Sequence, residues 1–438
     1  MASHVTILGA GPAGLAIGHY AKAAGLPFVI YERAGRWGGN CVTFEWNGFR
    51  YDSGAHRIHG GDGETLAVVS SLLPGALRSI SSPSFIQTGH GRYIFPLELR
   101  NILTTMPARR LAAGLKDLAW SLLTQSGCDG NFEELAVGRY GSLFAREFLL
   151  NYTEKLWGRP CRQLDTSLAG KRLAGLHPFD MLKTFLPAGG RVRHMEGAFF
   201  YPEGGIGRLT DALAASCGHA NIRLGQPVTR IVHDAGKIRA VGLDGGERVE
   251  VDAVVSTLPL DRFLRMLDPP VVPDRVPEGL RFRNLVLVAL FLDRGSVLPA
   301  ASAYFPMTDI PFTRAYEPRN RCGSMSPPGK TSLVVEIPCN RTDPVWQRPD
   351  PEVAQRVVDA FGRLDWFRGS EVLNFSVQRM EDAYPVLTID CRRSLAEAER
   401  ALRGIANLKL AGRNGRFSYS WIHNQVAWGR TIARELGA

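Results

Sequence analysis

The first forty residues alternate between short apolar runs and a helical pattern, in the order of a βαβ unit. Val5–Leu8 is apolar except for Thr6 and is predicted to be a buried strand. Residues 15–24 have the pattern of a helix, and Phe28–Tyr31 is a second apolar run of strand length. Strands that alternate with helices at this spacing predict an α/β fold with a parallel sheet.

Similar signals return in the second half of the chain. Residues 408–411 are expected to form a strand that ends in the turn Gly412-Arg413-Asn414-Gly415, and residues 422–436 have a helical pattern. A helix is expected at 209–217, and strands are expected at 221–224, 227–232, 237–243, 248–251 and 254–258. We therefore predict one discontinuous domain made of residues 1–61, 196–262 and 405–438.

The middle of the chain follows other patterns. Residues 62–195 are predicted to form a mainly helical insertion domain, with helices at 66–73, 97–103, 109–123 and 132–148. Apolar runs at 285–292 and 331–337 predict strands of a separate, mixed sheet, and we expect a substrate domain at 263–404.

One predicted helix, at 106–120, has cations opposite large apolar side chains. The cations are Arg109, Arg110 and Lys116, and the apolar residues are Leu111, Leu115 and Trp120. This pattern fits a helix that packs on the protein core, and it also fits a helix that lies on a membrane surface.

Composition narrows the class of protein. Of 438 residues, 45% are hydrophobic and 21% are charged, which excludes disordered and collagen-like chains. The net charge of +10 favours an anionic ligand, but no basic block indicates nucleic acid. Seven cysteines without a CxxC pair predict a reduced, cytoplasmic protein without a metal site. Neither a signal peptide nor a membrane-spanning run is evident, and the oligomeric state is not indicated.

A glycine motif lies between the first strand and the first helix. It reads Gly9-Ala-Gly11-Pro12-Ala13-Gly14, and Glu32 follows 23 positions after Gly9. In a Rossmann-type fold the first glycine makes the tight turn, the second admits a pyrophosphate and the third packs the helix on the strand. The helix N-terminus then binds the phosphates, and the acid binds a ribose. The sequence therefore predicts a dinucleotide site.

A second glycine-rich turn follows the acid, with Arg33, Arg36, Gly38, Gly39 and Asn40. It resembles the second phosphate-contact loop of FAD-binding flavoproteins with a glutathione-reductase-like fold. The resemblance implies FAD as the cofactor, with Val228 facing the adenine and with Gly412 and Arg413 at the flavin end. Whether NAD(P)H reduces the flavin directly is left open.

Six strings, in order along the chain, extend the resemblance over nearly the full length. They are Gly38-Gly-Asn40, Gly54-Ala-His56-Arg-Ile-His59, Tyr152-Thr-Glu-Lys-Leu-Trp157-Gly, Ile310-Pro-Phe-Thr-Arg314, Tyr384-Pro-Val and Gly412-Arg-Asn-Gly-Arg-Phe-Ser-Tyr419. The chain thereby resembles the UDP-galactopyranose mutase and protoporphyrinogen-oxidase-like branch of the FAD-dependent amine-oxidase superfamily. It departs from the mutase pattern at Phe417 and at Asn424-Gln425.

The resemblance implies roles for individual residues. Arg314, Tyr384 and Tyr419 would hold the diphosphate of a nucleotide sugar, and Tyr419 would also contact the cofactor. Tyr152 and Trp157 would line the sugar and nucleoside, and Arg172 would be a second arginine of the site. His56 and His59 would lie beside the flavin, with His56 contacting the cofactor and both acting in catalysis with Arg314. Phe200 or Tyr201 would close over the base.

Each of these residues also has a structural interpretation. Tyr152, Trp157 and Tyr419 fit ordinary packing, the two histidines fit structural hydrogen bonding, and Arg314 fits a solvated surface position. For the whole chain we expect a pyranose–furanose mutase that acts on a nucleotide-activated sugar through N5 of reduced flavin. The alternatives are an FAD-dependent oxidoreductase of secondary metabolite or polysaccharide biosynthesis and a non-catalytic FAD-binding module.

Overall fold

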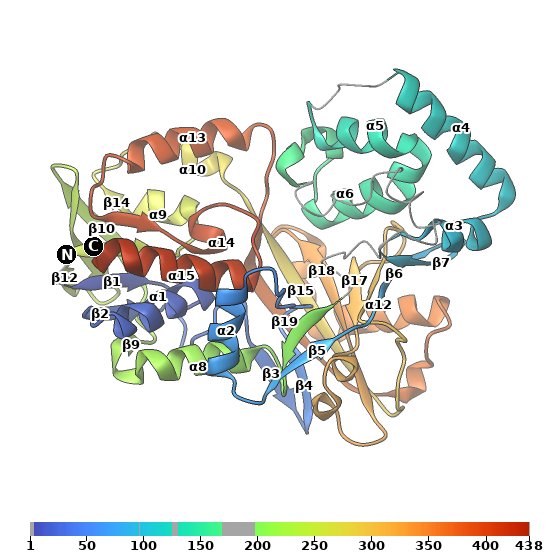
Figure 1. Cartoon of the computed structure of the whole chain (residues 1–438), viewed down its shortest axis with the longest axis horizontal. Coiled ribbons are helices and arrows are strands. Elements are labelled where there is room, and N and C mark those ends of the chain that lie inside the picture. Colours follow the sequence, from blue (N-terminus) through green and yellow to red (C-terminus); the bar gives the residue numbers. More distant parts are fainter. Residues whose placement is uncertain (1–3, 96, 125–129, 169–197, 438) are drawn as a thin grey trace.

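Both ends of the chain contribute to one five-stranded parallel sheet (Figure 1). The computed structural model describes residues 4–95, 97–124, 130–168 and 198–437. The sheet order is β20-β13-β1-β2-β9, and every neighbouring pair is parallel. The strands are β1 (Val5–Leu8), β2 (Phe28–Tyr31), β9 (Ile222–Arg223), β13 (Ala253–Ser256) and β20 (Leu408–Leu410). The predicted α/β fold class is thus confirmed.

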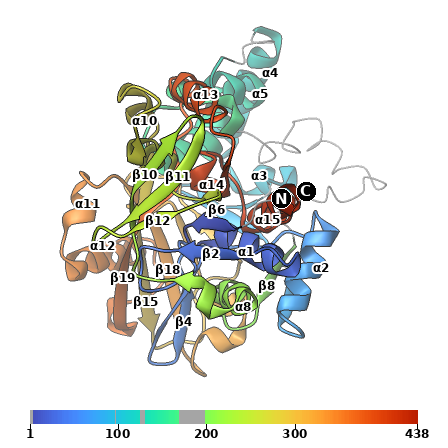
Figure 2. The same ribbon diagram turned by 90° about the vertical axis from the view of Figure 1, so that its left-hand side faces the viewer.

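Helices from distant parts of the sequence pack beside this sheet. α1 (Pro12–Ala23) contacts both α8 (Gly207–Cys217) and α15 (Ile422–Gly437), and Figure 2 shows α1 and α8 beside β2. Gly429 makes the α1–α15 contact close, because a Cβ there would lie 2.7 Å from the Cβ of Ala16. The last helix of the chain is therefore held against the first, next to the glycine turn.

A smaller, four-stranded sheet extends this part of the molecule, in the order β12-β11-β10-β14. Its strands are β10 (Val228–Asp234), β11 (Lys237–Leu243), β12 (Arg248–Glu250) and β14 (Leu267–Asp268). Three short helices pack near it, namely α9 (Leu260–Met266), α10 (Arg275–Gly279) and α13 (Cys391–Leu402). α14 (Gly412–Gly415) follows β20 directly.

A seven-stranded mixed sheet forms the other half of the body, in the order β19-β15-β18-β17-β16-β6-β7. Its strands are β6 (Ser84–Thr88), β7 (Gly91–Phe95), β15 (Phe282–Leu292), β16 (Ser302–Tyr304), β17 (Arg314–Tyr316), β18 (Thr331–Cys339) and β19 (Val372–Pro385). All neighbours are antiparallel except β16 and β6. The predicted mixed sheet containing 285–292 and 331–337 is confirmed.

β15 is apolar on both faces because both faces are covered. Val286 and Val288 point into the core formed with α12 (Asp350–Arg363), and α11 (Pro344–Gln347) precedes that helix. Leu287 and Phe291 point to the opposite face, which is covered by the hairpin of β3 (Thr43–Trp46) and β4 (Phe49–Asp52). Alternate side chains of a strand face opposite sides of the sheet, so a strand buried on both sides has an unbroken apolar run.

A helical lobe projects from the body (Figure 1). Its helices are α3 (Leu99–Thr105), α4 (Ala108–Thr124), α5 (Phe132–Ala145) and α6 (Asn151–Trp157), and a π-helical turn at Arg146–Leu150 joins α5 to α6. α2 (Gly63–Leu72) lies apart from them, beside α8 and α15. No described helix is long and apolar enough to cross a bilayer.

The expectation of a mainly helical segment at 62–195 is incomplete. β6 and β7 join the mixed sheet, and β5 (Leu77–Ile80) pairs with β8 (Phe199–Pro202). β5 and β6 are four and five residues long and pair with β8 and β16, which are distant along the chain, so local periodicity gives little sign of them. β7 joins the sheet through its hairpin with β6. The division of the chain into three domains stays a prediction.

Candidate active site

A groove runs along the carboxyl ends of β1 and β2, where the glycine turn lies. Gly9 has φ +100°, and a Cβ at Gly14 would overlap the carbonyl oxygen of Gly9. A Cβ at Gly11 would meet no other atom within 4 Å. Gly9 and Gly14 therefore serve the turn itself, while Gly11 leaves open space over the start of α1, where a pyrophosphate fits.

Glu32 is fixed at the end of β2 by the backbone. Its Oε2 accepts the N–H of Ala10 at 2.8 Å, and its Oε1 accepts the N–H of Ala34 at 2.9 Å. Nearby, Arg36 donates to the carbonyl of Gly39 at 3.2 Å. These contacts hold the acid and both glycine turns in one arrangement, as a site for a ribose and two phosphates requires.

Most residues predicted to bind FAD line this groove. They are Gly9, Gly11, Pro12, Ala13, Glu32, Arg33, Arg36, Gly39, Asn40, His56, Val228, Gly412 and Arg413. Gly14 lies beneath the turn, and Gly38 (φ +96°) shapes the second turn without lining the groove. Tyr419 lines a different cavity.

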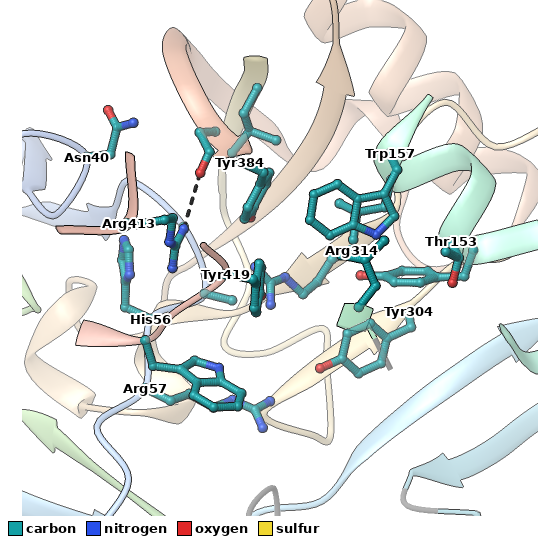
Figure 3. Close-up of a pocket in the computed structure, with 18 of the residues that line it drawn as sticks. Asn40, His56, Arg57, Thr153, Trp157, Tyr304, Arg314, Tyr384, Arg413 and Tyr419 are labelled. Atoms are coloured by element: carbon teal, nitrogen blue, oxygen red, sulfur yellow. Dashed lines mark hydrogen bonds between the residues drawn. The ribbon is translucent and has the colours of Figure 1, made fainter. Parts of the chain in front are cut away.

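That second cavity meets the groove at its flavin end. Six residues line both, namely Asn40, His56, Met380, Ala383, Arg413 and Ile422. The predicted substrate residues Tyr152, Trp157, Arg314, Tyr384 and Tyr419 all line the cavity, as does His59. Figure 3 shows Trp157, Arg314, Tyr384 and Tyr419 around it. Arg172 lies outside the described residues.

Arg314 already has a carboxylate partner inside the protein. Its Nε and Nη2 donate to Glu336 at 2.7–3.0 Å, and Glu336 is 1% exposed. Burial is the largest single effect and opposes the charge of Arg314, but the Glu336 carboxylate together with the neighbouring tyrosines raises the pKa of Arg314 above its ordinary value. The edge formed by Nε and Nη2 faces Glu336, so Nη1 is the nitrogen of Arg314 that a ligand could reach.

Glu336 also holds the loop that carries His56. Its Oε1 accepts the N–H of Ala55 at 2.9 Å. One carboxylate therefore connects the flavin side of the site, through Ala55, with the cavity side, through Arg314. Sequence reasoning missed Glu336, although a single acid within the apolar run of β18 was a usable signal.

Aromatic rings and a guanidinium form one wall of the cavity (Figure 3). Tyr384 and Tyr419 are stacked with ring centroids 6.2 Å apart, and Trp157 meets both edge-on at about 6 Å. Arg413 lies over both tyrosines and donates to the carbonyl of Ala383. Burial, reinforced by the Glu336 charge, raises the pKa of Tyr384, so its hydroxyl stays a hydrogen-bond donor.

Another part of the cavity lining is apolar. Ile86, Phe95, Phe132, Phe148 and Leu149 line it, and they come from the mixed sheet and the helical lobe. Tyr152 meets Tyr304 edge-on at 5.6 Å. None of the described residues that line the cavity is acidic.

The two predicted histidines differ in position. His56 lies where groove and cavity meet, and burial together with the charges of Arg413 and Arg314 lowers its pKa to about 3. His59 lines the cavity but not the groove, and its ring lies edge-on to that of His423 with centroids 5.5 Å apart. Because His56 is a neutral imidazole near pH 7, it can donate a hydrogen bond to a ligand or accept one from it without contributing charge.

A buried cationic cluster lies behind the loop and was not predicted. Arg57 donates to Ser84 at 2.9 Å and also lines the cavity. Arg321 lies 4.5 Å from the ring of Tyr316 and donates to the carbonyl of His56. Arg57 lies between His56 and His59 in the sequence. Its positive charge was the one sequence signal that could have marked it as a site residue.

The prediction that Phe200 or Tyr201 closes over a base is wrong. The hydroxyl of Tyr201 donates to buried Asp52 at 2.5 Å, and its ring is 0% exposed. Phe200 packs on the core beside the parallel sheet. Neither residue lines the cavity, because β8 carries both away from it.

A comparison with protein families matches residues 12–436 to the family described as flavin containing amine oxidoreductase. The chain belongs to the flavin-containing amine oxidoreductase family. Members of this family bind a flavin, and the groove has the open glycine turn and the ribose acid that the dinucleotide form needs. FAD is therefore the cofactor of this flavoenzyme, and the resemblance seen in the sequence is confirmed.

Solved structures share the fold of this amine oxidoreductase. Reduced UDP-galactopyranose mutase superposes with a TM-score of 0.88 at 20% identity, covering 99% of this chain and 94% of the mutase. A protoporphyrinogen-oxidase-like protein from Exiguobacterium sp. 255-15 superposes with a TM-score of 0.79 at 18% identity, covering 100% and 99%.

Two curated relatives of similar sequence are named as enzymes that act on phytoene. Phytoene dehydrogenase of Streptomyces griseus is 25% identical over 78% of this chain and 73% of its own length. The zeta-carotene-forming phytoene desaturase of Myxococcus xanthus is 27% identical over 35% of this chain, and this match spans about a third (34%) of that relative.

We predict that Gly11→Leu folds but loses most of its FAD. A side chain at Gly11 meets no protein atom, so it enters the groove where the pyrophosphate binds. Flavin absorbance per chain and the thermal melting curve measure the two effects. Gly295→Leu, in an exposed loop with equal free space, is the matched control and should keep its FAD. Full FAD occupancy in Gly11→Leu would refute the position given to the cofactor.

We also predict that His56→Gln makes stability less sensitive to acid. The pKa of His56 is near 3 in the folded chain and about 6.5 when unfolded, so the unfolded state binds more protons as the pH falls below 6.5. Between pH 6.5 and 5 the parent should lose about 1.6 kcal/mol from this group, because the unfolded imidazole is half protonated at pH 6.5 and the slope rises toward about 1.4 kcal/mol per pH unit below it. Urea unfolding of FAD-loaded parent and variant at both pH values measures the difference. Equal losses would show that His56 titrates normally.

Proposed function

We propose that this flavoenzyme acts on a nucleoside-diphosphate sugar, with pyranose–furanose mutase chemistry. The observation that carries the proposal is the cavity beside the flavin end of the groove. It is lined by Arg57, Arg314 and Arg413 and by no acidic residue among those described. Guanidinium groups in a partly dry cleft favour phosphate, and aromatic faces favour a sugar or a base.

The residues on the cavity wall have separate tasks in this proposal. Nη1 of Arg314 and the hydroxyls of Tyr384 and Tyr419 donate hydrogen bonds to the diphosphate. Trp157 and the stacked tyrosines cover the ligand and exclude water. Reduced FAD supplies a nucleophilic N5 when it is bound. His56, neutral at the junction of groove and cavity, orients the reacting sugar by hydrogen bonding and adds no charge.

The overall similarity to UDP-galactopyranose mutase supports this assignment, since it extends over 99% of the chain. The chemistry of a mutase also suits the residues present. Its ring contraction needs a leaving diphosphate and a reduced flavin, and it needs no strong acid–base pair from the protein.

A second candidate is an FAD-dependent oxidoreductase with an apolar substrate. The side of the cavity formed by Ile86, Phe95, Phe132, Phe148 and Leu149 favours it, as do the names of the two curated relatives. In this case the arginines and tyrosines would bind a polar end group of the substrate or would serve the structure alone.

Net redox change should distinguish the two candidates. Protein reduced with dithionite at less than one equivalent per turnover, and supplied with UDP, GDP and dTDP hexoses, should form a furanose product over many turnovers. No oxidant is consumed, because the sugar is isomerised and the flavin is regenerated in its reduced state. Product analysis by chromatography, with acceptor consumption followed in parallel, measures this. Product formed one-for-one with acceptor consumption, or no product from any nucleotide sugar, would favour the oxidoreductase.

We predict that Arg314→Lys weakens UDP binding about tenfold to hundredfold. Lysine keeps a charge opposite Glu336, so the fold is preserved, but it loses the second amino group that reaches the ligand. Hydrogen bonds to charged groups contribute about 1.5–3 kcal/mol, and about 1.4 kcal/mol is tenfold in affinity. Calorimetric titration with UDP, together with flavin content, measures the change.

Arg416→Lys provides the matched control, because Arg416 is an exposed arginine that lines neither the groove nor the cavity. Its UDP affinity should equal that of the parent. An unchanged UDP affinity in Arg314→Lys with FAD retained would remove Arg314 from the ligand site and argue against a diphosphate.

A further inference from the structure

The outer edge of the helical lobe carries an unusual concentration of exposed apolar side chains. Among the described residues, seven large hydrophobic side chains are exposed, and five of them lie on α3 and α4. These are Leu103, Leu115, Trp120, Leu122 and Leu123; Trp120 is 66% exposed and Leu123 is 81% exposed. Exposed apolar residues gathered in one place mark a contact surface, whereas single ones do not. We call these five residues the lobe patch.

α4 buries two small residues at its contact with α5 and exposes several large apolar residues on its other side. Gly114 and Ser121 are buried, and a Cβ at Gly114 would overlap the ring of Phe144 on α5. Leu115 and Leu122, seven positions apart, lie together on the exposed side. An amphipathic helix in a water-facing position has its large apolar residues against the core. The close α4–α5 contact therefore fixes α4 with an apolar face toward the surroundings.

The position of α4 leaves this face accessible. In both views α4 forms the outer rim of the lobe, away from the two large sheets (Figures 1 and 2). α5 and the π-helical turn lie on its inner side, and they contribute Phe132, Phe148 and Leu149 to the cavity wall. The lobe patch is thus separated from the cavity by one layer of helix.

Positively charged side chains lie beside the lobe patch and indicate a partner with negative charge. Arg100, Arg109 and Lys116 are exposed there, and none forms an ion pair with a described residue. Arg110 is paired with Glu147. Within residues 99–124 Asp117 is the single acidic residue, and its Oδ2 accepts the N–H of Leu143 at 2.7 Å. The exposed charge at this surface is therefore positive.

We propose that the lobe patch docks on an anionic lipid bilayer. The apolar side chains enter the interface, Trp120 lies at the headgroup level, and Arg109 and Lys116 meet the lipid phosphates. A second copy of the chain fits less well. A symmetric contact through α4 brings these cations together with no exposed carboxylate of α3 or α4 to neutralise them.

Co-sedimentation of the FAD-loaded full chain with sucrose-loaded vesicles tests the proposal. The chain should bind vesicles of phosphatidylcholine with phosphatidylglycerol, and should bind pure phosphatidylcholine weakly. Raising the salt concentration should weaken binding, because it screens the cations. Trp120→Ser/Leu123→Ser should lower the partition coefficient at least about tenfold, since two large apolar groups no longer enter the interface.

Two further variants separate a surface effect from a folding effect. Leu373→Ser replaces an exposed leucine of β19 outside the lobe and should bind vesicles like the parent. Lys116→Glu keeps the apolar residues and reverses one charge, so it should lower binding to the anionic vesicles. Flavin content should match the parent in every variant, since none of these residues lines the groove.

Other results overturn the proposal. Absence of binding to anionic vesicles, or equal binding by parent and Trp120→Ser/Leu123→Ser, would exclude a lipid surface. A dimer detected by light scattering that this double variant converts to a monomer, without vesicle binding by the parent, would show that a second copy covers the patch.

Discussion

The buried contact between Glu336 and Arg314 determines how the rest of the site can be arranged. A carboxylate at 1% exposure loses most of its hydration and is stable as an ion only with strong partners. It has two of them, the Arg314 guanidinium and the N–H of Ala55. Because removal of one partner leaves an uncompensated charge inside the protein, the three groups act as a unit. Strand β18 is thereby connected both to β17 and to the loop that carries His56.

This contact also sets the charge that a ligand meets. The Glu336 carboxylate neutralises Arg314 at its rear edge, while Arg413 donates its hydrogen bonds to the neutral carbonyl groups of Ser420 and Ala383. The cavity therefore keeps positive potential without a free carboxylate among its described lining residues. Another part of the lining is hydrocarbon. A ligand with an anionic part and a large uncharged part is complementary to both parts of the lining, which is why sugar nucleotides and lipid-like substrates are the two candidates.

Local signals predicted much of this architecture. The glycines at 9, 11 and 14 have distinct steric environments that follow from their places in the motif, and the strands of the parallel sheet were evident from short apolar runs. What sequence reasoning missed depends on contacts between distant segments. Nothing near Arg314 indicates that Glu336 occupies half of its guanidinium, and nothing near Tyr201 indicates that Asp52 binds its hydroxyl in the core. Strand β6 was missed for the same reason, since it pairs with the distant β16.

The six residues shared by the groove and the cavity have an energetic consequence. His56, Arg413 and Ile422 are among the side chains that face both spaces. A molecule in the cavity that orders these side chains changes the free energy with which the groove retains its dinucleotide. Thermodynamic linkage makes the effect reciprocal, so cofactor loading alters affinity in the cavity by the same factor. Heterotropic coupling between the two occupants is thus built into the wall they have in common.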